Sequence, residues 1–251
     1  MKLFTTIVFL FFATFYVNAQ NIFISKGKIE FEKKVNVHKQ IDFDSEGDEG
    51  GWAATLKKTT PQYKSTYFDL YFDETRSVYK PGKEVTGAQR VPDWISGPAN
   101  DNVIYHDLTQ ERITAQKNVF ENTFLIQDSA RKIEWRITPD TRTIAGFECR
   151  KAVGRIMDSV YVIAFYSEQI VPASGPESFG GLPGMILGVA IPRINTTWFA
   201  TKLELVAVRP EDLVIPKKGK KVSNQQLFDL LKPSMKDWGK FGQKNIWLSM
   251  L

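Results

Sequence analysis

The chain contains few of the residues and motifs from which catalytic and metal sites are usually built. Cysteine occurs once, as Cys149, so no disulfide can form within the chain. Histidine occurs twice, as His38 and His106, and neither belongs to an HExxH zinc motif. The GxSxG nucleophile elbow and the glycine-rich patterns of phosphate-binding loops are also absent. The sequence therefore predicts no catalytic residue, no metal ligand and no cofactor.

Long apolar runs are also absent, except at the N-terminus. There Lys2 precedes an apolar stretch from Leu3 to Val17, which a small-residue V-N-A site follows. This order predicts a signal peptide over residues 1–19, cleaved near Ala19–Gln20. The stretch has about 15 residues, fewer than the roughly 20 that a membrane-spanning helix needs. We therefore expect a periplasmic or secreted protein with no transmembrane segment in the mature chain.

Neither sign of charge is in large excess: the chain has 33 basic and 28 acidic residues and a formal net charge of +5. Part of the basic excess lies in KKGKK, Lys217–Lys221. Such a cluster could bind an anionic surface or nucleic acid, but a solvated linker is the interpretation we favour in an exported protein. Aromatic residues do not alternate with basic ones as they do in base-stacking surfaces. We expect no nucleic-acid partner.

The sequence does contain many short runs typical of β-strands. From Gly27 onward, apolar residues alternate with charged ones, which is the period of a half-buried strand. Residues 65–80 predict a hairpin that turns at 73–75, and similar runs separated by turn residues continue to residue 208. The predicted fold is mainly β, a large curved antiparallel sheet with meander connections, half-barrel in form, and a short helical C-terminal segment.

The C-terminal part differs from the rest, because its apolar residues follow a helical period. Ser223 is placed to cap a helix over NQQLFDLL, which Pro233 would stop or restart. We expect a signal peptide at 1–19, an antiparallel β domain at 20–216, and a basic hinge with a helical tail at 217–251 packed on the same domain.

The acidic segment Asp42–Trp52 lacks the spacing of a calcium-binding loop and predicts a solvated loop.

One glycine-rich stretch stands out, SFGGLPGMILGVAIP at residues 178–192. Pro183 sets φ near −65° and Gly184 allows a positive φ, so Leu182–Met185 predicts a type II turn. The apolar run that follows predicts a strand covered on both faces, and Gly188 marks a bulge or a close approach. We interpret the hexapeptide as a structural turn, with a ligand-binding turn as the alternative; its residues are Gly181, Leu182, Pro183, Gly184, Met185 and Ile186.

This hexapeptide resembles the one that names the GLPGLI family of exported Bacteroidota proteins, with Met185 in place of leucine. The resemblance continues upstream through KIEWRI, TIAGFECRKA and AFYSEQI, although Phe165 stands where the family often has tryptophan. It implies a β-rich protein of unknown function, often encoded beside TonB-dependent outer-membrane receptors, and it transfers no catalytic residue. It also implies O-glycosylation at Asp-Ser-aliphatic sequons, for which Ser129 and Ser159 are the candidates.

These observations lead us to expect a non-enzymatic periplasmic binding or accessory protein, linked to a TonB-dependent outer-membrane transport system. The expected partner is a TonB-dependent receptor or another envelope protein, and the expected ligand is a peptide, a glycan or a lipid. An exported hydrolase that cuts peptides or glycans through carboxylates is the alternative, since two carboxyl groups suffice for glycosidic bonds. A purely structural envelope protein is a third hypothesis.

Overall fold

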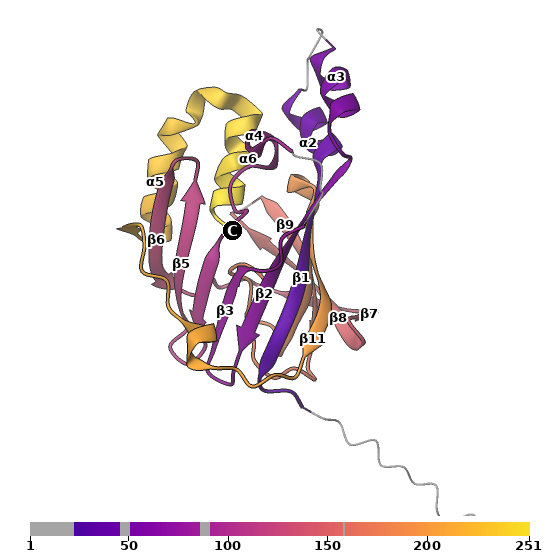
Figure 1. Ribbon diagram of the computed structural model, residues 1–251, viewed down its shortest axis with the longest axis vertical. Helices are drawn as coiled ribbons and strands as arrows, with labels where there is room; N and C mark the ends of the chain where they lie inside the picture. The colour runs from indigo at the N-terminus through magenta and orange to yellow at the C-terminus, as the bar shows by residue number, and fades with distance from the viewer. Residues whose placement is uncertain (1–22, 46–50, 86–90, 158) are drawn as a thin grey trace, which may run out of the picture.

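The computed structural model describes residues 23–45, 51–85, 91–157 and 159–251 (Figure 1). The predicted signal peptide and its cleavage site at Ala19–Gln20 lie outside the described residues, and so does Asp158 of the second sequon. Among the helices of the described segments, none combines the length and apolarity that crossing a membrane requires.

One open sheet of twelve strands dominates the fold, which confirms the mainly β class. The strand order is β12-β6-β5-β4-β3-β2-β1-β11-β10-β9-β8-β7, so two meanders meet where β1 pairs with β11. The pairs are antiparallel, except that β12 runs parallel to β6. The strands are β1 (Gly27–Asn36), β2 (Tyr63–Phe72), β3 (Arg76–Pro81), β4 (Val103–Asp107), β5 (Arg112–Val119), β6 (Asn122–Ser129), β7 (Arg136–Ile144), β8 (Phe147–Ile156), β9 (Val160–Ser167), β10 (Met185–Ile191), β11 (Thr196–Glu204) and β12 (Lys220–Val222).

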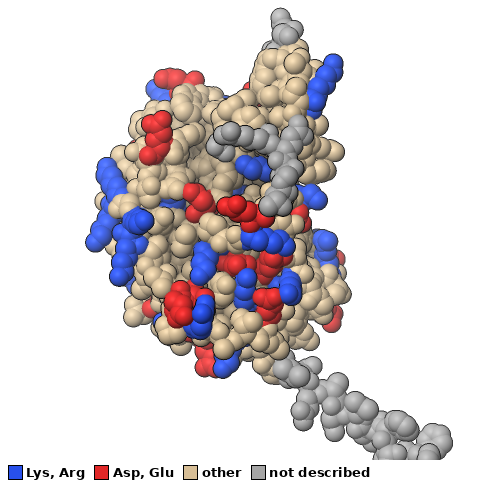
Figure 2. All heavy atoms as spheres, viewed as in Figure 1, with Lys and Arg blue, Asp and Glu red and all other residues tan. Residues whose placement is uncertain are grey.

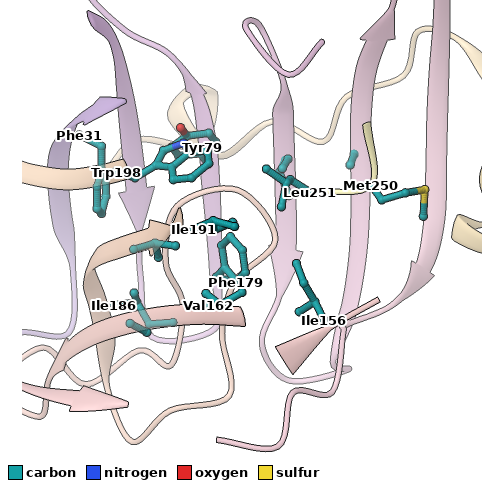
Figure 3. Packing of buried hydrophobic residues seen from close by; sticks show 14 of the residues in the cluster. Phe31, Tyr79, Ile156, Val162, Phe179, Ile186, Ile191, Trp198, Met250 and Leu251 are labelled. Atoms are coloured by element: carbon teal, nitrogen blue, oxygen red, sulfur yellow. The ribbon is translucent and has the colours of Figure 1, made fainter. Parts of the chain in front are cut away.

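The sheet curves strongly, so the wall from β1 to β6 faces the wall that contains β8 and β9 (Figure 1). A single core fills the space between the walls. It joins Phe31 and Phe68 from the first wall to Val162 and Tyr166 from the second. Figure 3 shows the middle of this core, where Tyr79 and Trp198 meet above Phe179. The predicted curved, open sheet is therefore confirmed.

Three helices that the sequence analysis did not predict follow β1 and β3: α2 (Val37–Asp44), α3 (Trp52–Thr59) and α4 (Asp93–Ser96). The Asn36 side chain accepts from the Lys39 amide at 3.0 Å and starts α2, which ends the predicted first strand. A second small core of Val37, Ile41, Val91 and Ile95 holds these helices. The loop predicted at Asp42–Trp52 was too long at both ends, because α2 extends to Asp44 and α3 begins at Trp52. Residues 46–50 lie outside the described chain.

The C-terminal region holds α5 (Asn224–Ser234), the short 3-10 turn η3 (Lys236–Trp238) and α6 (Gly239–Ser249). Two further 3-10 turns come earlier, η1 (Pro192–Ile194) between β10 and β11 and η2 (Pro210–Leu213) between β11 and β12. Ser223 and Gln226 form a reciprocal capping box at the start of α5, as the sequence predicts. Pro233 lies inside the last turn of this helix. The basic segment expected to be a hinge supplies β12, because Lys220–Val222 pairs with the exposed edge of β6.

The glycine-rich turn is tighter than the predicted type II turn. The Gly184 amide donates to the Leu182 carbonyl at 2.8 Å, and the Met185 amide donates to Ile170 at 2.9 Å. The hydrogen bond from the Met185 amide to the Leu182 carbonyl that closes many type II turns is therefore not formed, although Gly184 has the predicted positive φ, +127°. Two other predictions are confirmed: β10 is buried on both faces, and the register with β9 shifts between Ile186 and Gly188.

Candidate functional site

A groove runs along the open side of the curved sheet, where the end of β6 approaches the end of β8. Three adjoining cavities of about 690, 660 and 330 Å³ form it. The first and third cavities share residues 130–132, and the first and second share Met157, Asn224 and Met250. We call the three together the seam groove. Its length, and its position between two walls of the sheet, suit an extended ligand better than a compact one.

Basic side chains predominate along the seam groove. The described residues that line the two larger cavities include two acidic ones, Asp128 and Glu134, and the basic ones Arg131, Lys132, Arg155, Arg193 and Lys232. Both oxygens of the Asp128 carboxylate accept backbone amides, from Ser129 at 2.8 Å and from Asn224 at 2.9 Å. Asp128 therefore fixes the start of α5, and the groove presents a positive lining to a ligand.

Aromatic rings hold two of these cations in place. The Arg193 guanidinium lies 4.9 Å from the centre of the Trp247 ring, and the Lys232 ammonium lies 5.7 Å from that of Phe228. A cation over an aromatic face keeps its hydrogen-bond donors available at the ring edge. The second cavity is thus lined by two cations that lie over aromatic rings.

On the outer face of the first wall, charged side chains of the described residues pair with one another. Lys28 binds Asp69 at 2.9 Å, and Lys83 binds Glu30 at 3.0 Å. Figure 2 shows acidic and basic side chains interspersed over this face, in front of β1 to β3. Neighbouring charges of opposite sign cancel at a distance, so this face attracts no ion of either sign strongly.

The hexapeptide touches the seam groove only at its first residue. Gly180 and Gly181 line the smallest cavity together with His106. The side chains of Leu182, Met185 and Ile186 are buried in the core. Pro183 is exposed, and Gly184 packs so closely on β9 that a Cβ there would lie 2.3 Å from the Ser167 carbonyl oxygen. Burial lowers the pKa of His106, so its imidazole is neutral at pH 7.

The two serines of the candidate sequons lie on the rims of the larger cavities. Ser129 ends β6 and lines the first cavity, and Ser159 precedes β9 and lines the second. Both are exposed. The fold thus brings two sites 30 residues apart to the same groove, where a glycan on either serine would border a bound ligand. O-glycosylation itself stays a prediction.

At its inner end the groove meets the last residues of the chain. Three side chains donate to three consecutive backbone carbonyls: Lys117 to Ser249 at 3.3 Å, Arg131 to Met250, and Ser178 to Leu251. We call these three donors the carbonyl clamp. Figure 3 shows Met250 and Leu251 lying between the strands and pointing into the core. Burial, together with the nearby Arg131 charge, lowers the pKa of Lys117 to about 7, and burial lowers that of Arg131 to about 10.

A polar cluster lies deeper in the core, around Glu177. Its carboxylate accepts from the Asn102 side-chain amide at 2.8 Å. Lys33 donates to the Ala99 carbonyl and lies 5.6 Å from the centre of the Trp198 ring. Burial lowers the pKa of Lys33 to about 8, and the Glu177 charge opposes this shift. Burial raises the pKa of Tyr79, so its hydroxyl stays protonated at physiological pH.

The sequence analysis did not predict that Lys33 and Lys117 are buried, although their positions in the alternating strand pattern indicate it. In β1, Lys33 falls on the same alternate positions as the buried residues Ile29 and Phe31. In β5, Lys117 likewise falls on the same alternate positions as Ile113 and Ala115. A lysine in phase with inward-facing residues is a candidate buried cation.

The described residues contain neither a metal-binding cluster nor a reactive thiol. Among them, no three His, Cys, Asp or Glu side chains gather closely enough to hold a metal ion. Cys149 is buried, and its burial raises the pKa of its thiol to about 11. The thiol is therefore protonated at neutral pH and a poor nucleophile.

Comparison with known proteins finds a family match, and it covers a short part of the chain. A family model described as "Protein of unknown function (Porph_ging)" matches residues 154–188, which run from β8 through β9 and the hexapeptide into β10. No curated protein matches the chain. The matched segment contains the hexapeptide on which the sequence resemblance rests, so the chain is similar there to a family of unknown function.

Two solved structures share the fold. The structure of PNGF-II in the C2 space group aligns with a TM-score of 0.51 and 14% identity, over 90% of this chain and 33% of that one. The structure of PNGF-II in the P21 space group aligns with a TM-score of 0.51 and 13% identity, over 84% of this chain and 34% of that one. This chain spans about a third of the length of the PNGF-II chains. At such identities the likeness concerns the fold alone.

Proposed function

We propose that this chain is a non-enzymatic binding protein of the bacterial envelope, and that an extended acidic peptide is its ligand in the seam groove. The positive lining of the two larger cavities is the observation that carries the proposal. Cations in a concave site attract an anionic ligand and raise its local concentration. A lipid tail would bury these cations without partners, which is costly.

The carbonyl clamp favours a peptide over a glycan. Its three donors already bind main-chain carbonyls of a peptide segment beside the groove. A peptide presents carbonyl oxygens at regular intervals and acidic side chains between them. Such a ligand would offer its acidic side chains to the cations Lys132 and Arg155.

The hydrolase alternative gains no support from the groove. Glycosidic cleavage needs two carboxyl groups that face the bond. Of the acidic side chains that line the larger cavities, Asp128 has both oxygens engaged by backbone amides. We therefore favour binding over hydrolysis.

The proposal includes the cellular setting. The predicted signal peptide and the resemblance to the GLPGLI family support a periplasmic or secreted protein that assists a TonB-dependent outer-membrane receptor. Affinity purification of the full chain from its native envelope tests this role. We expect a receptor or another envelope protein among the specific interactors, and their absence would contradict the accessory role.

The groove is tested with a fluorescein-labelled hexaglutamate peptide and the double variant Lys132→Glu/Arg155→Glu. Fluorescence anisotropy should show at least about tenfold weaker binding, because both substitutions replace attraction by repulsion. The control, Lys217→Glu/Lys218→Glu, makes the same change in net charge at two exposed residues outside the groove. It should stay within about twofold of the parent chain. Equal losses in both variants would show unspecific attraction and contradict the proposal.

A further inference from the structure

The carbonyl clamp and the segment it holds suggest how the groove is regulated. We propose that the clamp is a second peptide subsite, for an apolar peptide end, and that residues 244–251 of the chain itself fill it when no ligand is bound. This inference rests on the proposed function, since it extends the same groove inward. The ligand of this subsite is a peptide that enters with its backbone carbonyls toward Lys117, Arg131 and Ser178.

The clamp binds main-chain carbonyl oxygens, which every peptide has. Lys117 lies on β5, Arg131 on the connection from β6 to β7, and Ser178 in the loop before β10. These separate elements converge on three consecutive carbonyls. Since carbonyl oxygens are the acceptors, another peptide could replace residues 249–251 without losing these hydrogen bonds.

Apolar pockets accompany the clamp. The side chains of Leu248, Met250 and Leu251 are buried. Leu248 lies directly on Gly97, where a Cβ would come within 2.5 Å of the leucine Cδ1. The glycine thus leaves room for one apolar side chain of the bound segment. The subsite therefore prefers a peptide with large aliphatic residues at these positions.

The helix that fills the subsite is held less firmly than an apolar helix would be. α6 begins at Gly239 and contains Gly242, and glycine is a poor helix former. The helix also buries the Asn245 side-chain oxygen, for which the described residues provide no hydrogen-bond partner. Displacing this helix is correspondingly less costly.

The seam groove leads directly to the subsite. Met250 lines both larger cavities, and Arg131 and Ser178 line the smallest. A peptide bound in the groove therefore meets the segment that it would replace. Because that segment is attached to the chain, its effective concentration is high, so a free peptide displaces it only when present in large excess.

A labelled peptide with the sequence of residues 244–251, KNIWLSML, tests this competition on the full chain. Leu248→Ala should loosen the chain's own segment and leave the clamp intact, so the labelled peptide should bind at least about tenfold more tightly than to the parent. Adding Lys117→Met should remove most of this gain, because the donor to the first carbonyl is lost. A scrambled peptide, MKLSNWLI, should bind neither protein tightly.

Hydrogen exchange of the parent chain is the second measurement, and it decides the question if Leu248→Ala does not fold. Excess KNIWLSML should speed the exchange of the α6 amides, while the scrambled peptide should not. A folded Leu248→Ala variant without tighter peptide binding, or unchanged α6 exchange in the parent, overturns the inference. Hexaglutamate binding separates the two proposals: if it still depends on Lys132 and Arg155, the proposed function stands even when the subsite fails.

Discussion

The indole Nε1 of Trp135 donates a hydrogen bond to the Gly180 carbonyl oxygen at 3.0 Å. This bond ties the segment before β7 to the loop that enters the hexapeptide. The ring also lies on β8 at Gly154, where a Cβ would come within 2.8 Å of it. Trp135 therefore links three parts of the chain at the smallest cavity of the seam groove, and a glycine beneath it makes the contact possible.

Trp135→Phe should destabilise the protein by about 1 kcal/mol, because it removes a hydrogen-bond donor and leaves the Gly180 carbonyl without that partner. Urea unfolding followed by circular dichroism measures the change. Trp94→Phe is the matched control, since Trp94 is 44% exposed and should change stability by less than about 0.5 kcal/mol. Equal effects of the two substitutions would contradict a structural role for the Trp135 hydrogen bond.

Gly184→Ala should be far more damaging than Gly146→Ala. Both glycines have a positive φ, +127° and +87°, but an added Cβ would lie 2.3 Å from the Ser167 carbonyl oxygen at Gly184 and would meet nothing within 4 Å at Gly146. We expect a loss of about 3 kcal/mol or more at Gly184, where strain and clash add, and of about 1 kcal/mol at Gly146, where strain acts alone. Thermal unfolding compares the two variants. Similar melting temperatures would mean that the hexapeptide turn can relax.

Stability should rise with pH above neutrality because of Lys117. Its pKa falls from 10.5 in the unfolded chain to about 7 in the folded one, so the unfolded chain binds more protons between these values. The contribution of Lys117 to the free energy of unfolding therefore grows as pH rises from 7 and is lowest below pH 7. Lys33 acts in the same direction, with a pKa of about 8.

Lys117→Met isolates this effect. As pH rises from 7 to 9.5, the free energy of unfolding of the parent should increase by an amount on the order of 2 kcal/mol more than that of the variant. Urea unfolding at several pH values measures the difference. A difference that stays constant with pH would contradict the burial of Lys117 in the core.

Cys149 should react with a thiol reagent such as DTNB about a hundredfold more slowly in the native protein than in concentrated guanidinium chloride. The thiol is buried, and burial raises its pKa to about 11, so little thiolate exists and access is blocked. A matched control moves the thiol to the groove rim, in Cys149→Ala/Ser129→Cys, which should react at the rate of an exposed thiol. Fast labelling of native Cys149 would refute its burial.

Local patterns in the sequence account for the elements that were predicted well. The β2–β3 hairpin follows from alternation on both sides of the Asp73–Thr75 turn, where the Asp73 side chain accepts the amides of Thr75 and Arg76. The start of α5 follows from the Ser223 capping box. These signals lie within a few residues of each other, so no distant contact is needed to interpret them.

Distant contacts explain what the sequence analysis missed. α2 continues directly from β1, and its apolar residues Val37 and Ile41 pack on Val91 and Ile95, about 50 residues away. The hexapeptide turn takes its form from Ile170, which uses the Met185 amide that closes many type II turns. In both places a partner remote in sequence overrides the local preference.

Alternation, turn residues and the helical period at the end of the chain, each a property of neighbouring residues, were enough to establish a curved, mainly β fold with a helical tail. The tertiary structure alone decided where a ligand could bind. The seam groove, its positive lining and the carbonyl clamp join residues from His106 to Leu251 that come together only when the two walls of the sheet close on the C-terminal segment. Charge and hydrogen-bond donors act over a few ångströms, so their combined chemistry exists only in the folded chain.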